Sequence, residues 1–367
     1  MGGANTPTYE ISVGGTTDGG DRVPDLKPRE ALERWLNKLR VSKAESTVSA
    51  YHYRLKHFVE WCESEGIETV DELTGWDVET FETSRREQGL KPITLNNELG
   101  TLKSFFEYCA RIEIAHEDLP EKVDVPDVDA SEQVSEARLA PDEARRLLEY
   151  YESNDDAYGT RAHALLALEW YTGARLGAIR GLDLEDYDRD EQYVTFVHRP
   201  RKGTPLKNGT DGERIVGLPE HVCDVVDEYI RSDRHEKYDD YGRSSLLTSE
   251  VGRPSTNGVR AWTQFATVPC LYRECPHGED RSTCEYLDYS AISKCPSSRS
   301  PHMVRTGSIT WQLNRGIPPE RVSERVNTSI DVLLRHYDQP SRMEELRERR
   351  RPYLDRLTFS DESGDSE

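Results

Sequence analysis

The sequence has no long apolar run and no segment typical of secretion. None of its 367 residues belongs to an apolar stretch approaching the ~20 residues that cross a bilayer. The segment Met1–Asp21 is rich in Gly and Thr and has no hydrophobic signal region. Its seven cysteines are an odd number, which argues against a disulfide scaffold. The composition therefore predicts a soluble, cytoplasmic protein without a membrane partner.

Lysine is also scarce, whereas acidic residues are abundant. Of 48 basic residues only about 11 are Lys, against 69 acidic ones, and the formal charge is -21. This charge opposes long-range attraction to a nucleic acid. The same balance, however, suits hydration in concentrated salt, which at molar strength screens charges beyond ~3 Å. We hypothesise a salt-loving host, the alternative being a surface-solubility effect in an ordinary cytoplasm.

The length predicts two domains with tails at both ends. Apolar residues at helical spacing predict a bundle of four helices over residues 28–116, and we expect tails at 1–27 and 358–367. Ser46 and Thr94 are expected N-caps, and Gly66 and Gly89 expected helix ends. Residues 117–136 contain two prolines and many acids without periodicity, which predicts an interdomain linker.

The second domain is expected over residues 137–357, starting with a helix at Pro141. A helix, a break at Thr172-Gly173 and a short second helix follow. The runs YVTFVH and ERIVGL predict a hairpin or small sheet, and the later segments return to helical spacing. The expected fold class is mainly α with a small β-sheet.

The second domain contains residues suited to chemistry on a phosphodiester. Without a metal, such chemistry needs a nucleophile, cations against the non-bridging oxygens and a proton donor for the leaving hydroxyl. Arginine fits because its planar fork binds phosphate oxygens bidentately and keeps its charge. The candidates, in chain order, are Arg175 in TGARLGAIRGL, Lys207 in TPLKNGTDG, His302 and Arg305 in SPHMVRTGSIT, and Tyr337 in LLRHYDQ.

This order of Arg, Lys, His-x-x-Arg and Tyr resembles the tyrosine recombinase (phage integrase) family. The helical segments SKAESTVSAYHYRLKHFVEWCES and PITLNNELGTLKSFFEYC are similar to the family's N-terminal SAM-like core-binding domain. The resemblance covers nearly the whole chain between the tails. It implies a site-specific DNA recombinase or integrase that works through a 3′-phosphotyrosyl intermediate without a cofactor for catalysis.

The resemblance also implies a role for each residue. Tyr337 would attack the scissile phosphate, and Arg175 and Arg305 would hold it. Lys207 would protonate the leaving 5′-oxygen, a role for which Lys202 is a rival, and His302 would bind the phosphate or assist removal of the tyrosyl proton. We prefer Lys207 because it lies closer to ERIVGL and precedes Asn208-Gly209, a good tight-turn pair.

The sequence departs from the family pattern at two places. Asn327 or Thr328 stands where a second active-site His or Trp is common, and Ala178 replaces an acid that is often found three positions after the first Arg. Arg175 must therefore be oriented by another group. Two alternative functions stay open, a catalytically decayed DNA-binding regulator on the same scaffold and a type IB topoisomerase-like enzyme.

Four cysteines cluster in an insertion at residues 268–298, just before His302. Four thiolates could form a structural zinc site that braces His302 and Arg305, and unligated thiols or an iron–sulfur cluster are the alternatives. The predicted ligands are Cys270, Cys275, Cys284 and Cys295, with His277 as an alternative ligand.

The expected partner is double-stranded DNA, with no small-molecule substrate, and the resemblance implies four copies of the chain on two duplexes. The charge-dense C-terminal helix SRMEELRERRRPYLDRL would pack on a neighbouring copy or on its own domain. Candidate DNA contacts are basic residues of both domains: Lys43, Arg54, Lys103, Arg199, Arg201 and Lys202.

Overall fold

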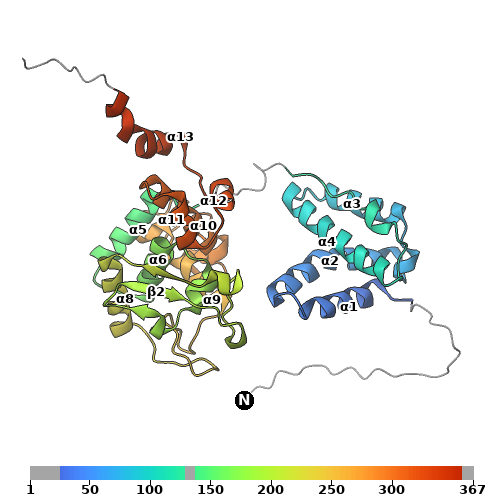
Figure 1. Cartoon of the computed structure of the whole chain (residues 1–367), viewed down its shortest axis with the longest axis horizontal. Coiled ribbons are helices and arrows are strands. Elements are labelled where there is room, and N and C mark those ends of the chain that lie inside the picture. The colour runs from blue at the N-terminus through green and yellow to red at the C-terminus, as the bar shows by residue number, and fades with distance from the viewer. Residues whose placement is uncertain (1–24, 129–136, 358–367) are drawn as a thin grey trace, which may run out of the picture. The chain divides into compact units, whose positions relative to one another are not determined.

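The computed structural model of the chain describes residues 25–128 and 137–357, which form two compact units (Figure 1). The first unit spans Met1–Gln133 and the second Val134–Glu367. Most of the expected N-terminal tail (1–24), part of the expected linker (129–136) and the expected acidic tail (358–367) lie outside the described residues.

The first unit is built from four α-helices, as the apolar spacing predicts. They are α1 (Pro28–Arg40), α2 (Glu45–Glu65), α3 (Gly75–Glu87) and α4 (Pro92–Arg111). Their apolar faces meet in one core, where the ring of Phe58 contacts those of Phe81 and Phe106 edge-on. These helices form because one stripe of each is apolar, and burial of that stripe is what stabilises them.

The ends of these helices are predicted correctly on the C-terminal side only. Gly66 adopts the left-handed conformation that ends α2, with φ of 74°. The predicted N-caps are wrong, because α2 is capped by Ala44 and α4 by Lys91. At α4 the reason is Pro92, whose fixed φ suits the first helical position, so the helix begins before Thr94.

The first part of the expected linker packs on the first unit. A short 3₁₀ helix covers Leu119–Lys122, and Leu119 and Val123 are buried in the unit's core. The backbone N–H of Asp124 donates to the carboxylate of Glu82 at 2.8 Å. Since these are ordered contacts, residues up to Val123 extend the first fold.

The second unit is mostly helical, with α6 at its centre in contact with α8, α9 and α10. Pro141 opens the first helix, as predicted. The helices are α5 (Pro141–Ser153), α6 (Arg161–Thr172), α7 (Leu176–Gly181), α8 (Glu220–Ser232), α9 (Thr256–Ala266), α10 (Pro301–Asn314), α11 (Pro319–Val326), α12 (Ile330–His336) and α13 (Arg342–Glu344).

A small antiparallel sheet lies beside these helices, in the order β1-β2-β3 (Figure 1). Its strands are β1 (Tyr187–Asp188), β2 (Tyr193–Phe196) and β3 (Arg214–Gly217). The predicted fold class, mainly α with a small sheet, is confirmed. A turn does form at residues 206–209, where Gly209 N donates to Leu206 O at 3.1 Å. It does not join the strands directly, because the β2–β3 connection runs over residues 197–213 and contains two short 3₁₀ helices.

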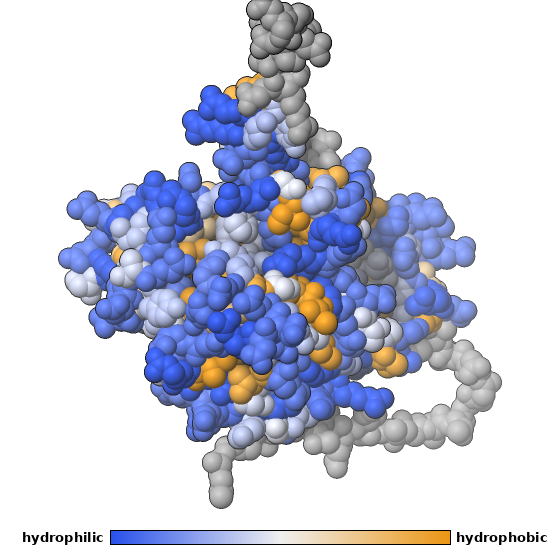
Figure 2. Space-filling view, turned by 60° about the vertical axis from the view of Figure 1, so that its left-hand side comes forward, coloured by the Kyte–Doolittle hydropathy of each residue, from blue (hydrophilic) through white to orange (hydrophobic). Residues whose placement is uncertain are grey.

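Beyond α13 the chain continues helically through Glu345–Arg350 and Arg351–Leu357. Glu344 pairs with Arg138 at 2.6 Å, and Arg349 pairs with Asp338, so the start of this segment packs on its own unit. The face in Figure 2 is mostly hydrophilic, with small and separate apolar areas. In the described ranges, no helix has the length and apolarity that a membrane crossing requires.

Candidate active site

The end of α11 is where the predicted site residues converge. Helix C-termini carry carbonyl oxygens without intrahelical partners and a partial negative charge, so they attract cations. Three consecutive carbonyls here accept hydrogen bonds from arginines on three separate elements. The pairs are Arg325 O with Arg214 Nε at 2.7 Å, Val326 O with Arg305 Nη1 at 2.9 Å, and Asn327 O with Arg175 Nη1 at 2.6 Å.

Arg175 is positioned by the helix break that the sequence predicts. Gly173 ends α6 with φ of 60°, and Arg175 is the N-cap residue of α7. The residue three positions on, Ala178, cannot orient a guanidinium. The carbonyl of Asn327 takes that role, so the missing acid is replaced by a backbone oxygen.

Arg305 is buried, with 1% of its surface exposed. Its Nη1 also donates to Gly173 O at 2.7 Å. Within residues 25–128 and 137–357 its Nε and Nη2 find no hydrogen-bond partner. Burial lowers the pKa of Arg305 to about 10, so it stays charged at neutral pH. Donors without a well-placed partner on a buried cation are costly. The Tyr337 phenol, which raises the pKa of Arg305, and an incoming anion are the groups that can accept from them.

Tyr337 lies directly against this cation. The Arg305 guanidinium is 4.9 Å from the centre of the Tyr337 ring, within the range of a cation–π contact. Tyr337 ends α12, and its carbonyl accepts from Thr310 Oγ1 at 2.7 Å. The ring is 7% exposed and packs in an apolar cluster that includes Leu333. The tyrosine is therefore both a core residue and a neighbour of Arg305.

His302 lies in the first turn of α10, two residues after the N-cap Ser300. It shares a face of the helix with Arg305, three residues further on. Its ring meets that of Tyr337 edge-on, with centroids 5.6 Å apart. Partial burial, and then the charges of Arg305, Arg175 and Lys207, lower the pKa of His302. The imidazole is therefore neutral at pH 7 and can accept a proton.

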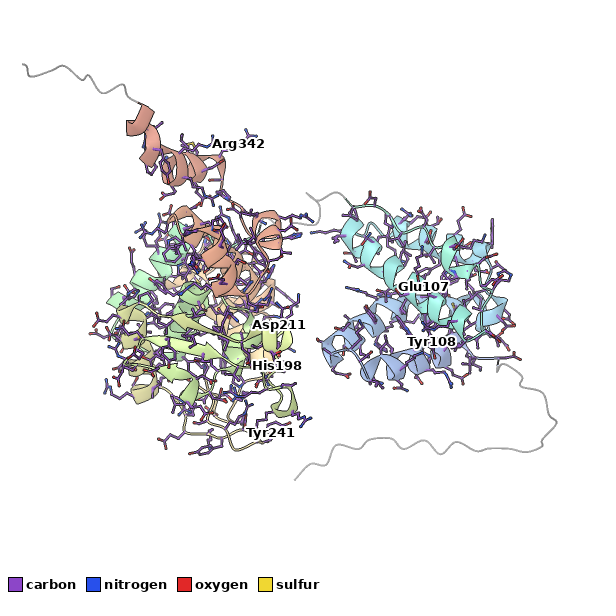
Figure 3. The ribbon with its side chains drawn as sticks, viewed as in Figure 1. Glu107, Tyr108, His198, Asp211, Tyr241 and Arg342 are labelled. Atoms are coloured by element: carbon purple, nitrogen blue, oxygen red, sulfur yellow. The ribbon has the colours of Figure 1, made fainter. Side chains whose placement is uncertain are left out.

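Lys207 is exposed on the β2–β3 connection, and its charge acts on His302. The rival Lys202 lies elsewhere on the same connection, where its carbonyl accepts from Arg243 Nη2 at 2.7 Å. His198 and Asp211, labelled in Figure 3, belong to this connection too. Lys207 thus belongs to the electrostatic surroundings of His302.

Asn327, one of the two residues predicted to stand in place of a second active-site imidazole, turns towards the connection. Its Nδ2 donates to Asp211 O at 2.8 Å, and its Oδ1 accepts from Asn208 Nδ2. Thr328 is half-buried, and its carbonyl accepts from Ser323 Oγ at 2.6 Å.

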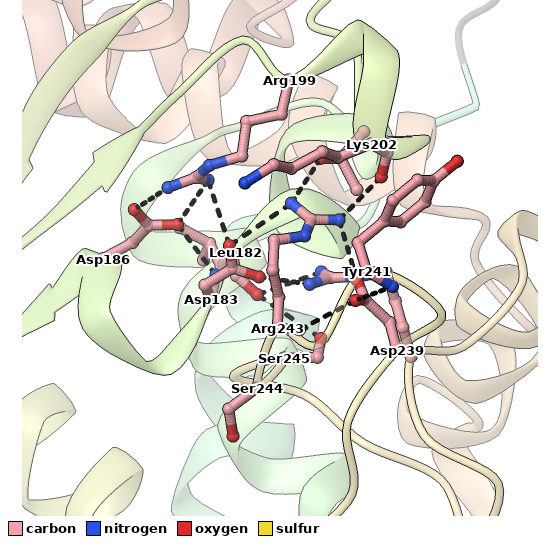
Figure 4. A network of polar contacts seen from close by, with 12 residues as sticks. Leu182, Asp183, Asp186, Arg199, Lys202, Asp239, Tyr241, Arg243, Ser244 and Ser245 are labelled. Atoms are coloured by element: carbon pink, nitrogen blue, oxygen red, sulfur yellow. Dashed lines mark hydrogen bonds and ion pairs between the residues drawn. The ribbon is translucent and has the colours of Figure 1, made fainter.

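A buried ion network supports the base of the same connection (Figure 4). Asp183, 1% exposed, pairs with Arg243 at 3.3 Å and also with Arg253. Arg199 pairs with Asp186 at 2.7 Å and lies within this network. Because its guanidinium is used there, we leave Arg199 out of the residues proposed to touch DNA.

The other candidate DNA contacts are on the surfaces of their own units. Lys43, Arg201 and Lys202 are exposed, and Lys103 is half-buried on α4. Arg54 is half-buried as well and donates to Thr101 Oγ1 at 3.2 Å.

The cysteine cluster forms no recognisable metal site. In the part of the chain that the structure covers, no group of three or more His, Cys, Asp or Glu side chains could hold a metal ion. All four cysteines are free, and His277 Nε2 shares a hydrogen bond with Ser297 Oγ at 2.8 Å. Cys270 and Cys295 instead pack beside the apolar cluster that contains Ile292. The structure therefore gives no support to zinc.

Sequence reasoning missed two arginines of the site. Arg214 on β3 holds the end of α11, and its pKa is lowered to about 9 by burial and by the neighbouring arginines. Arg325 donates from Nη2 to Tyr171 O at 2.7 Å and to Gly217 O at 2.8 Å. No motif marks either residue, because both bind backbone carbonyls that only the fold brings near.

Comparisons with known proteins show what the chain is similar to. Residues 32–112 match the family described as phage integrase, N-terminal SAM-like domain. The tyrosine recombinase XerD of Proteus mirabilis is 24% identical over 315 residues, which cover 84% of this chain and 86% of that protein.

Solved structures are similar as well. The N-terminal domain of a phage integrase/site-specific recombinase from Haloarcula marismortui is 50% identical, over 28% of this chain and 99% of that one, with a TM-score of 0.28. The integrase of the Tn1549 transposon, solved with transposon right end DNA, has a TM-score of 0.61 at 16% identity, over 90% of this chain and 99% of that one.

Proposed function

We propose that this chain, which belongs to the tyrosine recombinase (phage integrase) family, is a site-specific recombinase that cleaves and rejoins double-stranded DNA through Tyr337. The observation that carries the proposal is the contact between Tyr337 and Arg305, a buried cation whose Nε and Nη2 have no hydrogen-bond partner of good geometry among the described residues. A tyrosine beside an anion-binding site is the arrangement that attack on a phosphate requires.

In the cleavage step the Tyr337 oxygen forms a bond to phosphorus, and the bond from phosphorus to the 5′-oxygen breaks. The products are a 3′-phosphotyrosyl link and a free 5′-hydroxyl. His302, 5.6 Å from the tyrosine between ring centres, accepts the phenol proton as a neutral imidazole. Lys207 donates a proton to the departing 5′-oxygen, and rejoining reverses these transfers.

Arg305 and Arg175 hold the non-bridging oxygens and offset the charge that develops on them. The support for this is their common anchor on the end of α11, which fixes one nitrogen of each guanidinium. Because the anchors are made before DNA binds, little reorganisation accompanies the reaction. No metal or cofactor takes part in these steps.

The proposed partner is double-stranded DNA. The residues proposed to contact its phosphate backbone are Lys43, Arg54, Lys103, Arg201 and Lys202. Exchange between two duplexes requires four strand cleavages. Since each copy offers one Tyr337, four copies on two duplexes are the expected assembly. Light scattering of the complex with DNA would measure this, and a mass of one chain per cleaved duplex would contradict it.

The test uses a pool of nicked duplexes with random sequence, because the target is selected by the reaction itself. Wild type and Tyr337→Phe are incubated with the pool, and DNA that resists detergent washing is sequenced. We expect the wild type to retain a sequence family covalently and the variant to retain none. Specific binding without covalent capture would indicate a DNA-binding regulator. Covalent capture without joining of two duplexes would indicate a topoisomerase-like enzyme.

A further inference from the structure

Asn327 joins two parts of the site, Arg175 and the β2–β3 connection, through three separate atoms. Its carbonyl accepts from Arg175, its Oδ1 accepts from Asn208, and its Nδ2 donates to Asp211 O at 2.8 Å. We propose that Asn327 is a positioning residue that acts as a latch. It holds residues 207–211 of the β2–β3 connection, the Lys207 loop, against Arg175 and Arg305, the arginine clamp. The inference rests on the proposed cleavage reaction and assigns this side chain a role other than phosphate binding.

The Lys207 loop needs such a latch because it belongs to a long connection. Residues 197–213 join two short strands, and a long flexible connection carries a large conformational entropy. The ion network ties the base of the connection, where Arg243 binds Lys202 O and Thr204 Oγ1. The Asn327 side chain ties the opposite part, on both sides of Gly209. Lys207 directly precedes Asn208, so the latch limits where its ammonium can reach.

The chemistry of the latch suits asparagine. One side chain must accept a hydrogen bond and donate another, which a carboxylate cannot do and an amide can. Asn327 also has φ of 52°, a left-handed conformation that asparagine tolerates better than most residues. The loop engages Oδ1 and one of the two N–H groups of Nδ2, so the orientation of the amide is set by the loop.

Because the latch acts through Lys207, its loss should affect only protonation of the leaving group. The experiment uses the selected duplex in two forms, with oxygen or with sulfur as the 5′-bridging atom. A thiolate leaves without protonation, so a defect confined to the proton donor disappears on the sulfur substrate. Asn327→Gly is the main variant, since glycine keeps the left-handed backbone and the carbonyl that Arg175 needs.

We expect Lys207→Ala to cleave the oxygen substrate ~10²–10³-fold more slowly, the usual size of a proton-transfer contribution. Asn327→Gly should be slowed ~10-fold or more, and the double variant should be no slower than Lys207→Ala. Both single variants should approach the wild-type rate on sulfur. Asn208→Ala removes the loop side of the latch and should behave as Asn327→Gly does.

The matched control is Asn257→Ala. Asn257 is an exposed residue on α9, and among the described residues its Oδ1 accepts a hydrogen bond only from Arg260. This variant should cleave both substrates at the wild-type rate. Equal slowing of Asn327→Gly on oxygen and sulfur would overturn the inference, because the residue would then act on the phosphate or on the fold. If Asn327→Gly unfolds, the Asn208→Ala rates decide in the same way. Failure of the proposed function shows separately, as no covalent product from the wild type on either substrate.

Discussion

Glu169 is a buried acid on α6, one helical turn before the helix ends at Gly173. Its replacement by glutamine should change how the stability of the fold depends on pH. The residue is 2% exposed on α6, and its carbonyl accepts from Gly173 N at 3.0 Å. Its side chain shares a 2.9 Å hydrogen bond with Thr263 Oγ1, whereas Oε2 has no partner among the described residues. Burial raises the pKa of Glu169 from its ordinary 4.5 to about 8.

The sign follows from the two pKa values. Between pH 4.5 and about 8 the folded chain keeps a proton that the unfolded chain releases, so stability falls as pH rises through this window. A tenfold change in proton affinity corresponds to about 1.4 kcal/mol, so the loss reaches up to about 5 kcal/mol above pH 8. Glu169→Gln lacks this loss, at the cost of about 1 kcal/mol for an imperfectly paired amide.

The assay is urea unfolding of the full chain at pH 5 and pH 9, followed by tryptophan fluorescence, for which the adjacent Trp170 is a reporter. The difference between wild type and variant at one pH cancels the titration of all other groups. We expect the variant to be similar or slightly less stable at pH 5 and more stable at pH 9. A difference that is the same at both pH values would refute the reasoning.

Four other outcomes are expected. Burial and the nearby His221 lower the pKa of His163 from its ordinary 6.5 to about 4. The neutral ring therefore stabilises the fold above pH 6.5, and this stability is lost as the pH falls through 4. His163→Gln should reduce that loss in acid unfolding curves. Gly173→Ala should cost at least about 1–2 kcal/mol in thermal unfolding, because φ is 60° and the new Cβ would lie 2.9 Å from Val326 Cγ1. On the acid side, cleavage should stay constant down to the ordinary pKa of His302 and decline only below it, as a pH–rate profile from acid to neutral pH would show. Finally, the charge of -21 predicts that the unfolding midpoint rises from 0.1 to 2 M KCl, and a midpoint highest in dilute salt would contradict the salt-loving hypothesis.

Much of the architecture was predictable because it follows from local patterns. Apolar spacing located the four helices of the first unit, and Gly66 and Gly173 marked helix ends because both need a left-handed backbone. The predicted caps at Ser46 and Thr94 were wrong, since an earlier start or a nearby proline displaces the caps by two and three residues, to Ala44 and Lys91. A turn forms at residues 206–209, but it does not join the two strands directly, because a turn-forming pair does not reveal where the strands end.

The site was predictable in its residue types and only partly in its contacts. Arg175, His302, Arg305 and Tyr337 are recognisable from their order, and the structure places them around one point. That the charge of Lys207 lowers the pKa of His302 depends on how the connection folds back. The cysteines are the reverse case. Their spacing in the sequence predicted a metal site, but the described residues contain no group of side chains that could hold a metal ion.

The sequence by itself determined the fold class, the chemistry of the catalytic candidates and the helix break that presents Arg175, because side-chain chemistry and short-range backbone preference are local properties. Only the tertiary structure decided what orients the arginines and what holds the Lys207 loop. Both roles belong to the end of α11, whose carbonyls and Asn327 amide bind groups more than 100 positions away. Backbone oxygens are the same in every residue, so no sequence pattern can announce them as ligands.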